Sequence, residues 1–199
     1  ANLAWKLAAL YHGWGGPNLV ASYEKERRPI AVRNLAQSYA LAEIKSQINV
    51  PEGVEDNTAS GDSIRTNLGR RFMIELAEEY KCIGIQLGAQ YMASPLIEYD
   101  GSEQPCDDPY VFHPSACPGC RSPHSWLEDG TALFDQFGKW FTLLRFNEKT
   151  PVNNFVDAAS RMRVPLKVLT APKDINNLYQ ADLILIRPDQ YVAWRDAGH

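Results

Sequence analysis

Two histidines and two cysteines fall within twelve residues near the middle of the chain, in the order His113, Cys117, Cys120 and His124. Thiolates and imidazoles are the usual ligands of zinc, and a Cys-x2-Cys loop can present two thiolates to one tetrahedral ion. Known zinc spacings place a longer segment between the two ligand pairs, and three prolines stiffen this one. We therefore expect no metal site, and we expect the four side chains to lie in a proline-rich surface loop.

The spacing of Cys117 and Cys120 is also that of thiol redox motifs, in which the first thiol has a lowered pKa. A redox motif of this kind lies at the N-terminus of a helix that directly follows the first strand. Here the two cysteines come about twenty residues before the first clear strand, and a proline–glycine turn takes the place of the helix. Thiol redox chemistry is therefore not expected either.

Motifs for nucleotide binding or nucleophilic catalysis are missing from the sequence. The glycine-rich segment 13–17 follows a helical pattern instead of joining a strand to a helix, so we interpret it as a helix end. There is no G-x-S-x-G elbow, no H-E-x-x-H pair and no P-loop. Local motifs therefore assign no activity.

Composition narrows the class of protein. The 199 residues are 45% hydrophobic and 22% charged, with a formal net charge of −4. An acidic chain does not suit nucleic acid or an anionic membrane surface as a partner, since both favour a basic face. No apolar run approaches the roughly 18 residues of a membrane span. Four cysteines are too few for a disulfide scaffold, so we expect a cytoplasmic protein.

The first half of the chain predicts helices. Asn2 is expected to cap the first helix, and a second is expected to begin near Asn18 and to kink or restart at Pro29. Residues 50–62 are acidic and poor in large apolar side chains, which is typical of a loop. Apolar residues at strict i, i+4 spacing over 64–80 then predict a third, amphipathic helix.

The second half predicts short strands around one helix. Glycines and alternating apolar residues over 81–101 favour short extended pieces separated by turns. Further on we expect a helix over 150–162 and strands over 140–146, 164–170, 182–186 and 191–195. The fold class expected is therefore α/β, with an N-terminal helical segment (1–109) followed by a thioredoxin-like α/β domain (110–199).

Five segments resemble, in order, the C-terminal half of the FAD-dependent aromatic hydroxylases, the phenol-hydroxylase-like class A flavin monooxygenases. The segments are NLAWKLA (2–8), SYEKERRPIA (22–31), GIQLGAQYMASPLI (84–97), PSACPGCRSPHSWLEDGTALFDQFGKWFTLL (114–144) and RPDQYVAWR (187–195). The resemblance implies a thioredoxin-like last domain that has lost its redox cysteines. The sequence departs from the family pattern at Cys117, which stands where the family usually has an arginine.

The resemblance implies that the family's FAD-binding domain, with its glycine-rich turn, lies upstream of residue 1. The chain is therefore interpreted as a truncated member, which has no cofactor of its own. If an FAD domain is supplied, Asn2 and Leu3 match positions that lie beside the flavin in relatives.

The leading functional prediction is a flavin-free enzyme that acts on a hydrophobic natural-product intermediate. Its reaction would be a cyclisation, cycloaddition, isomerisation or dehydration, promoted by the shape of the pocket and a few hydrogen bonds. The polar side chains proposed for catalysis are Tyr91, Gln86, His124 and Arg121. Trp5 and Tyr23 are proposed as walls of the substrate pocket.

Two alternatives remain open at this point. The chain could be a fragment of a complete aromatic hydroxylase that uses FAD and NAD(P)H. It could also be a non-catalytic subunit that completes another protein. In the non-catalytic subunit, the face that packs on the FAD domain in relatives would be an uncovered apolar patch. The same holds for the flavin-free enzyme, so we expect a homodimer.

Overall fold

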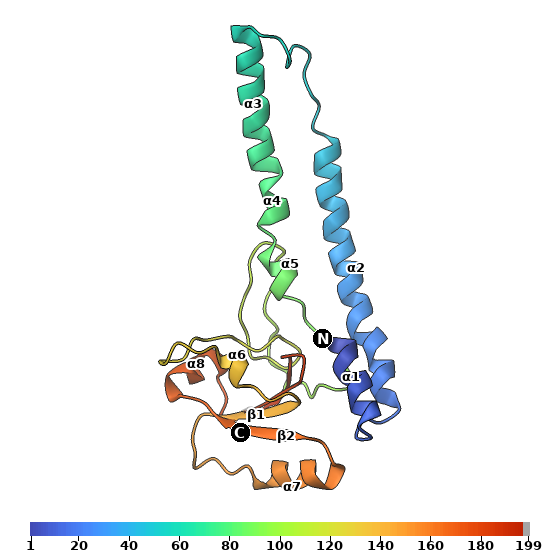
Figure 1. Cartoon of the computed structure of the whole chain (residues 1–199), viewed down its shortest axis with the longest axis vertical. Coiled ribbons are helices and arrows are strands. Elements are labelled where there is room, and N and C mark those ends of the chain that lie inside the picture. Colours follow the sequence, from blue (N-terminus) through green and yellow to red (C-terminus); the bar gives the residue numbers. More distant parts are fainter. Residues whose placement is uncertain (197–199) are drawn as a thin grey trace.

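The structure, a computed structural model, describes residues 1–196. The chain forms a long arm of two helices that stands on a base containing a four-stranded sheet (Figure 1). The N-terminus lies at the base, where the arm meets the coil that leads to the sheet. The fold is therefore mixed α/β, as predicted. Among the described residues, no helix combines the length and the apolar composition that crossing a membrane requires.

The first two helices pack on each other in the base. Helix α1 (Asn2–Tyr11) ends before Gly13, whose φ of 76° suits a residue without a side chain. Helix α2 (Asn18–Ser46) is a single helix of 29 residues that runs through Pro29. Of the two outcomes expected at Pro29, a restart does not occur: the helix continues through it, and the neighbouring Ile30 is buried.

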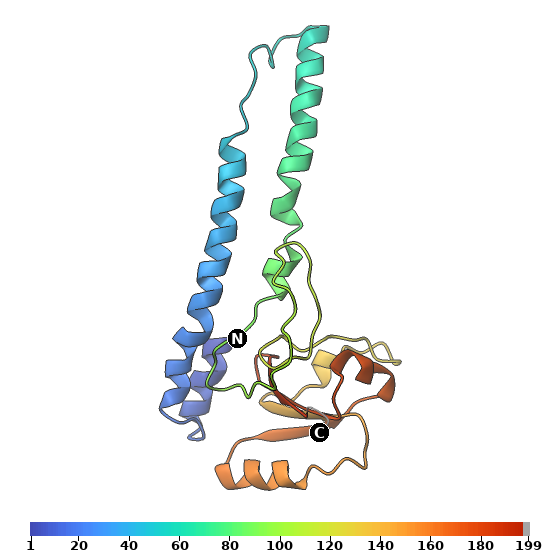
Figure 2. The ribbon, with the colours of Figure 1, turned by 180° about the vertical axis from the view of Figure 1, so that it is seen from behind.

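Three further helices descend the arm. Helix α3 (Ala59–Glu75) starts at Thr58, whose side chain accepts a hydrogen bond from the Gly61 amide at 3.1 Å. The short helices α4 (Ala77–Tyr80) and α5 (Ile83–Leu87) follow. The arm is joined at its far end by residues 47–58, and α2 and α3 run alongside each other in both views (Figure 1, Figure 2). Large apolar side chains along it remain exposed, among them Val32, Leu35, Tyr39, Met73, Ile74 and Tyr80.

The extended pieces predicted over 81–101 are not formed. That segment contains α5 and then irregular coil. Gly101 lies at a bend with a φ of 76°, whereas Gly84 serves close packing of the backbone. A Cβ on Gly84 would lie 1.8 Å from the carbonyl oxygen of Asp108, so only glycine fits there.

The sheet contains β1 (Phe141–Arg145), β2 (Leu166–Thr170), β3 (Leu183–Ile186) and β4 (Val192–Arg195) in the order β2-β1-β3-β4. Strands β1 and β2 are parallel and joined by helix α7 (Asn153–Met162), while β3 is antiparallel to both of its neighbours. This order and these orientations are those of a thioredoxin-like core, which confirms the predicted fold class.

The two faces of the sheet are covered differently. Leu144 and Ile184 point to the face covered by α6 (Leu133–Gln136), the 3-10 turn Lys173–Ile175 and α8 (Asn176–Tyr179), where the largest core cluster forms. The opposite face carries Phe141 and Leu143, and α7 lies on that side (Figure 1). Leu143 and Leu144 are both fully buried, so both faces contribute to the core.

We predict that Leu144→Ala lowers the free energy of unfolding by about 2–5 kcal/mol, because it removes a fully buried side chain from the centre of the sheet. Leu178→Ala on α8, where the side chain is 44% exposed, should cost less than about 1 kcal/mol. Urea unfolding followed by circular dichroism measures both changes. Equal losses in the two variants would contradict the sheet-centred core.

Candidate functional site

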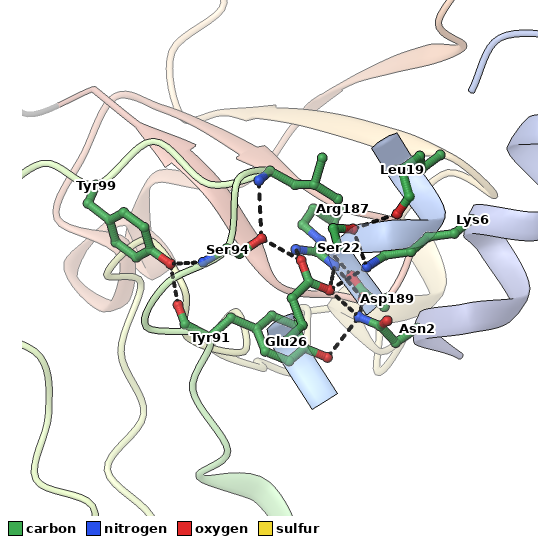
Figure 3. A network of polar contacts seen from close by, with 11 residues as sticks. Asn2, Lys6, Leu19, Ser22, Glu26, Tyr91, Ser94, Tyr99, Arg187 and Asp189 are labelled. Carbon is green, nitrogen blue, oxygen red and sulfur yellow. Dashed lines mark hydrogen bonds and ion pairs between the residues drawn. The ribbon is translucent and has the colours of Figure 1, made fainter. Parts of the chain in front are cut away.

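A buried network of polar side chains joins the helices to the sheet (Figure 3). It draws residues from four places in the sequence: helix α1, helix α2, the coil after α5 and the turn between β3 and β4. Its members, all buried, are Asn2, Lys6, Ser22, Glu26, Tyr91, Ser94, Arg187 and Asp189. The network therefore fixes how the helical segment sits against the thioredoxin-like domain.

Glu26 is the centre of this network. Its Oε1 accepts hydrogen bonds from Arg187 at 2.7 Å and Ser94 at 2.5 Å. Its Oε2 accepts from Lys6 at 2.6 Å, Asn2 at 2.6 Å and Arg187 at 2.9 Å. Burial alone would raise the pKa of Glu26, but the hydrogen bonds and positive charge of Arg187, helped by Asn2 and Lys6, hold it at about 2. The carboxylate is therefore ionised at any ordinary pH.

The buried charges balance. Lys6 and Arg187 face Glu26 and Asp189, and the Arg187 guanidinium bonds both carboxylates. Burial lowers the pKa of Lys6 against the opposing pull of Glu26. Burial would also lower the pKa of Arg187, but the hydrogen bond to Glu26 and the charge of Asp189 raise it. Two cations and two anions that are almost entirely shielded from water form a structural junction, in which removal of any one charge leaves a net charge buried.

The sequence analysis missed Glu26, although a signal was present. Leu19, Ser22, Glu26 and Ile30 are the buried residues of α2, and they follow one another at spacings of three, four and four. That spacing places Glu26 on the same face as the apolar residues. The neighbouring charges Glu24 and Arg28, which form an exposed i, i+4 pair, concealed it.

An open cleft of about 570 Å³ lies beside the N-terminus of α1. Four of the residues proposed from sequence line it: Asn2, Leu3, Tyr23 and Tyr91. The Tyr91 ring stacks on Tyr191 with centroids 4.1 Å apart, and its hydroxyl accepts a hydrogen bond from the Asn2 amide at 3.0 Å. Burial, with the nearby carboxylate of Asp189, raises the pKa of Tyr91, so its hydroxyl stays protonated.

Asn2 does not cap α1, as the sequence had suggested. The cap position is Ala1, which has no side chain able to accept a bond, and Asn2 lies in the first turn. Its Nδ2 faces Glu26, Tyr91 and Asp189, while its Oδ1 is buried without a hydrogen-bond partner among the described residues. The Asn2 side chain is held in the buried network by these contacts and is not available to cap the helix.

The other residues proposed for the site lie elsewhere. Arg121 and His124 line a separate hollow of about 460 Å³, where both rest against the ring of Phe134. Gln86 is exposed on α5, and its amide lies 3.5 Å from the Cys82 sulfur. Trp5 is buried on the other side of the network from the cleft, within an aromatic cluster. The four proposed catalytic side chains are thus not brought together, and only Tyr91 reaches the cleft.

Cys117 and Cys120 are buried free thiols, so the expectation of a surface loop is wrong for them. Burial, with the neighbouring Cys117, raises the pKa of Cys120 to about 12, the opposite of a redox thiol. His124 is exposed and contacts the rings of Trp126 and Phe134. Within residues 1–196, no three His, Cys, Asp or Glu side chains form a group that could hold a metal ion.

Comparison with known proteins places this junction in a family. Residues 1–38 match a family model described as an FAD binding domain, and residues 115–199 match one described as the C-terminal part of aromatic-ring hydroxylases. The chain belongs to the FAD-dependent aromatic hydroxylase family. It matches the C-terminal part of the family's members. The expectation that the FAD-binding domain lies wholly upstream of residue 1 needs correction, since the matching model extends to residue 38.

Members of the family align with nearly the whole of this chain. The FAD-dependent monooxygenase opdD of Penicillium oxalicum is 34% identical over 97% of the chain and 39% of its own length. A structure of the rebeccamycin biosynthetic enzyme RebC with reduced flavin superposes with a TM-score of 0.85 at 34% identity, covering 100% of this chain and 37% of RebC. The flavin-dependent monooxygenase PieE, in complex with FAD and substrate, gives a TM-score of 0.76 at 25% identity, covering 98% and 40%. The chain thus spans about two fifths of the length of such relatives.

The residues at the cleft fit one edge of a flavin. The first turn of a helix offers backbone N–H donors that have no partner within the helix, and α1 lacks a side-chain cap. The Oδ1 of Asn2 lies in the same turn, but it is shielded from solvent. A flavin ring carries carbonyl acceptors, so the backbone N–H donors suit its polar edge. The cleft is open to solvent, so its lining residues would border one side of a flavin and would not enclose it.

We predict that Glu26→Gln destabilises the protein most at neutral pH. The pKa of Glu26 is about 2 in the folded protein against an ordinary value of 4.5, so its contribution is complete above pH 4.5 and is lost as the pH falls towards 2. The free energies of unfolding of the wild type and the variant should therefore differ by about 3 kcal/mol at pH 7 and converge at low pH.

Glu24→Gln is the matched control, because Glu24 lies on the same helix with a side chain 74% exposed. It should change stability by less than about 0.5 kcal/mol at every pH. Chemical unfolding at a series of pH values measures both variants. A constant difference between Glu26→Gln and the wild type across pH 2–7 would show that Glu26 is not the buried carboxylate described here.

Thiol labelling tests the burial of the CxxC pair. With a disulfide reagent at pH 8, Cys106 should react first because it is exposed, and Cys106→Ser should remove that phase. Cys82 is half-buried and should follow in the folded protein. Cys117 and Cys120 should react only when the protein unfolds, because they are buried and burial raises the pKa of Cys120. Mass spectrometry of labelled peptides identifies the sites. Fast labelling of either buried thiol contradicts this arrangement.

Proposed function

We propose that this chain forms the C-terminal part of a flavin-dependent monooxygenase that acts on a hydrophobic aromatic intermediate of natural-product biosynthesis. In this proposal the cleft at the N-terminus of α1 borders both the flavin and the substrate. The proposal differs from the flavin-free enzyme favoured by the sequence, and it corresponds to the fragment alternative.

One observation carries the proposal. The segment that matches an FAD binding domain begins with an uncapped helix N-terminus and a buried asparagine whose Oδ1 has no partner among the described residues. Buried polar groups are nearly always satisfied, so the unpartnered Oδ1 at this helix end supports the proposal that a further group binds here. Asn2 cannot turn away to find water, because Glu26, Tyr91 and Asp189 hold its amide nitrogen.

In this proposal the residues of this chain would hold and orient FAD and the substrate, and they would take no part in the chemical reaction. Asn2 and the first-turn N–H groups would bind the polar edge of FAD, and Leu3 would pack beside it. Bound FAD, reduced by NAD(P)H, would supply the oxygen-activating chemistry of hydroxylation. Tyr23 and the stacked pair Tyr91 and Tyr191 present aromatic rings to the same cleft, which suits a flat, hydrophobic substrate.

The names of the relatives support this class of substrate. RebC is described as a rebeccamycin biosynthetic enzyme, and one of its structures holds 7-carboxy-K252c after a soak with chromopyrrolic acid. Other relatives are named as a phenol 2-monooxygenase of a Pseudomonas species and a putative polyketide hydroxylase of Streptomyces halstedii. The compounds in these names are aromatic or polycyclic.

The flavin-free conversion remains the second candidate, because the tyrosine-lined cleft of about 570 Å³ is large enough to hold an aromatic intermediate by itself. The predicted homodimer, through the face that packs on the FAD domain in relatives, also stays a prediction. Neither conflicts with the network, which would hold the cleft in shape in each case.

Titration of the purified chain with FAD tests the proposal. We expect saturable quenching of flavin fluorescence, and Ala4→Trp should weaken it at least about tenfold because a large ring at that position fills the cleft. Leu10→Trp is the matched control, since Leu10 is exposed on the same helix and does not line the cleft. Its FAD binding should equal that of the wild type.

A second measurement separates the two candidates. The chain is incubated with chromopyrrolic acid, with and without FAD and NADPH, and the mixture is examined by chromatography. The proposal expects no conversion when FAD is withheld. Conversion without FAD, lost in Ala4→Trp, would establish the flavin-free function instead. Absence of both FAD binding and conversion would overturn both candidates and leave the non-catalytic subunit.

A further inference from the structure

Two charged side chains line the cleft at the N-terminus of α1, and they differ in how they are paired. They are Arg27 and Asp189. Arg187 donates to both oxygens of Asp189 at 3.0 and 2.9 Å, and Asn2 donates to its Oδ2 at 2.9 Å. Arg27 forms no ion pair with any carboxylate that the structure describes. The cleft therefore presents a cation that has no ionic partner among the described residues.

Helix α2 places this cation at the wall of the cleft. Tyr23 and Arg27 are four residues apart, so they share one face of the helix, beside the buried Glu26. The next residue, Arg28, points to solvent with a side chain 77% exposed and pairs with Glu24 at 3.3 Å. Two adjacent arginines thus have different environments, and only the partly buried one lines the cleft.

The Arg27 guanidinium acts on the tyrosines of the cleft. Burial and then the charge of Asp189 raise the pKa of Tyr91, whereas a hydrogen bond and the charge of Arg27 oppose that rise. The same cation opposes the rise that burial causes in the pKa of Tyr191, whose ring stacks on Tyr91. A guanidinium has five N–H donors, so a contact with one hydroxyl leaves donors for a ligand.

These neighbours define the chemistry of a ligand. A guanidinium binds a carboxylate through two parallel N–H···O bonds, and a partly desolvated one does so more strongly than one in open water. The rings of Tyr23, Tyr91 and Tyr191 offer aromatic surface in the same cleft. A cationic ligand would be repelled by Arg27, because the carboxylate of Asp189 is already bonded within the network.

We propose that Arg27 recognises a carboxylate on the substrate, so that the cleft takes flat aromatic acids. The inference rests on the proposed function in one respect, since it takes the cleft as the substrate site. It adds the acidic class of the substrate and the residue that selects it. Arg27 on α2 would hold the acid group, while the first turn of α1 remains for the flavin edge.

Two probes of nearly identical shape test the proposal. At neutral pH 2-naphthoic acid is an anion, whereas 2-naphthamide has the same rings and no charge. Equilibrium dialysis of the full chain, without FAD, should show saturable binding of the acid. The amide should bind at least about tenfold more weakly, which is the effect of losing hydrogen bonds between charged groups. No saturable binding of the acid, or equal binding of the two probes, would overturn the proposal.

Variants of the two adjacent arginines locate the recognition. Arg27→Met should weaken binding of the acid at least about tenfold and leave the amide within about twofold, while Arg27→Lys should recover part of the preference because it keeps the charge. Arg28→Met is the matched control, since Arg28 does not line the cleft, and it should bind both probes as the wild type does. Equal losses in Arg27→Met and Arg28→Met would overturn the proposal, because they would indicate attraction by the surface charge alone.

Titration with FAD separates this inference from the proposed function. Arg27→Met should bind FAD as the wild type does, because the flavin edge is assigned to the first turn of α1. A tenfold loss of FAD binding in Arg27→Met, with the acid preference retained, would overturn the inference and assign Arg27 to the flavin. FAD binding without any preference for the acid would overturn the inference alone. An acid preference that depends on Arg27, without FAD binding, would uphold the inference and overturn the monooxygenase proposal.

Discussion

The ion pair between Glu26 and Arg187 is the interaction on which the arrangement of the molecule depends. The two residues are 161 positions apart in the sequence, and both side chains are fully buried. Arg187 also lies over the rings of Trp5 and Tyr91, at 5.4 and 5.1 Å from their centroids. Because Trp5 belongs to the aromatic cluster and Tyr91 lines the cleft, one guanidinium positions an aromatic ring in each.

Such a junction contributes more to specificity than to net stability. Taking two cations and two anions out of water costs free energy, and their mutual attraction offsets most of that cost. An apolar junction of the same volume could therefore be as stable. What the charges add is a single geometry. Glu26 uses both oxygens, and Arg187 bonds two carboxylates, so a shift of α2 against the turn at Asp189 would break several bonds at once.

The sequence predicted the regular elements far better than the site. The strand at Phe141 and its partners follow from runs of apolar residues bounded by turns, and the helix faces follow from their periodicity. The coil after Gly84 was mistaken for strands because glycines that permit close backbone packing resemble glycines of turns. The site was harder still: the helical spacing places Glu26 on the buried face of α2, but no local pattern states that its partner is Arg187, 161 positions away.

The position of this ion pair also relates the two regions of family similarity. Glu26 lies within the segment that matches an FAD binding domain, and Arg187 within the segment that matches the C-terminal part of aromatic-ring hydroxylases. The Asn2 amide bonds both Glu26 and Asp189, so the first turn of α1 is held from both regions. A thioredoxin-like domain whose two CxxC-spaced thiols are buried and unpaired has a physical role in this arrangement. It supplies the turn that carries Arg187 and Asp189, and that turn fixes the helix end at which a flavin would be bound.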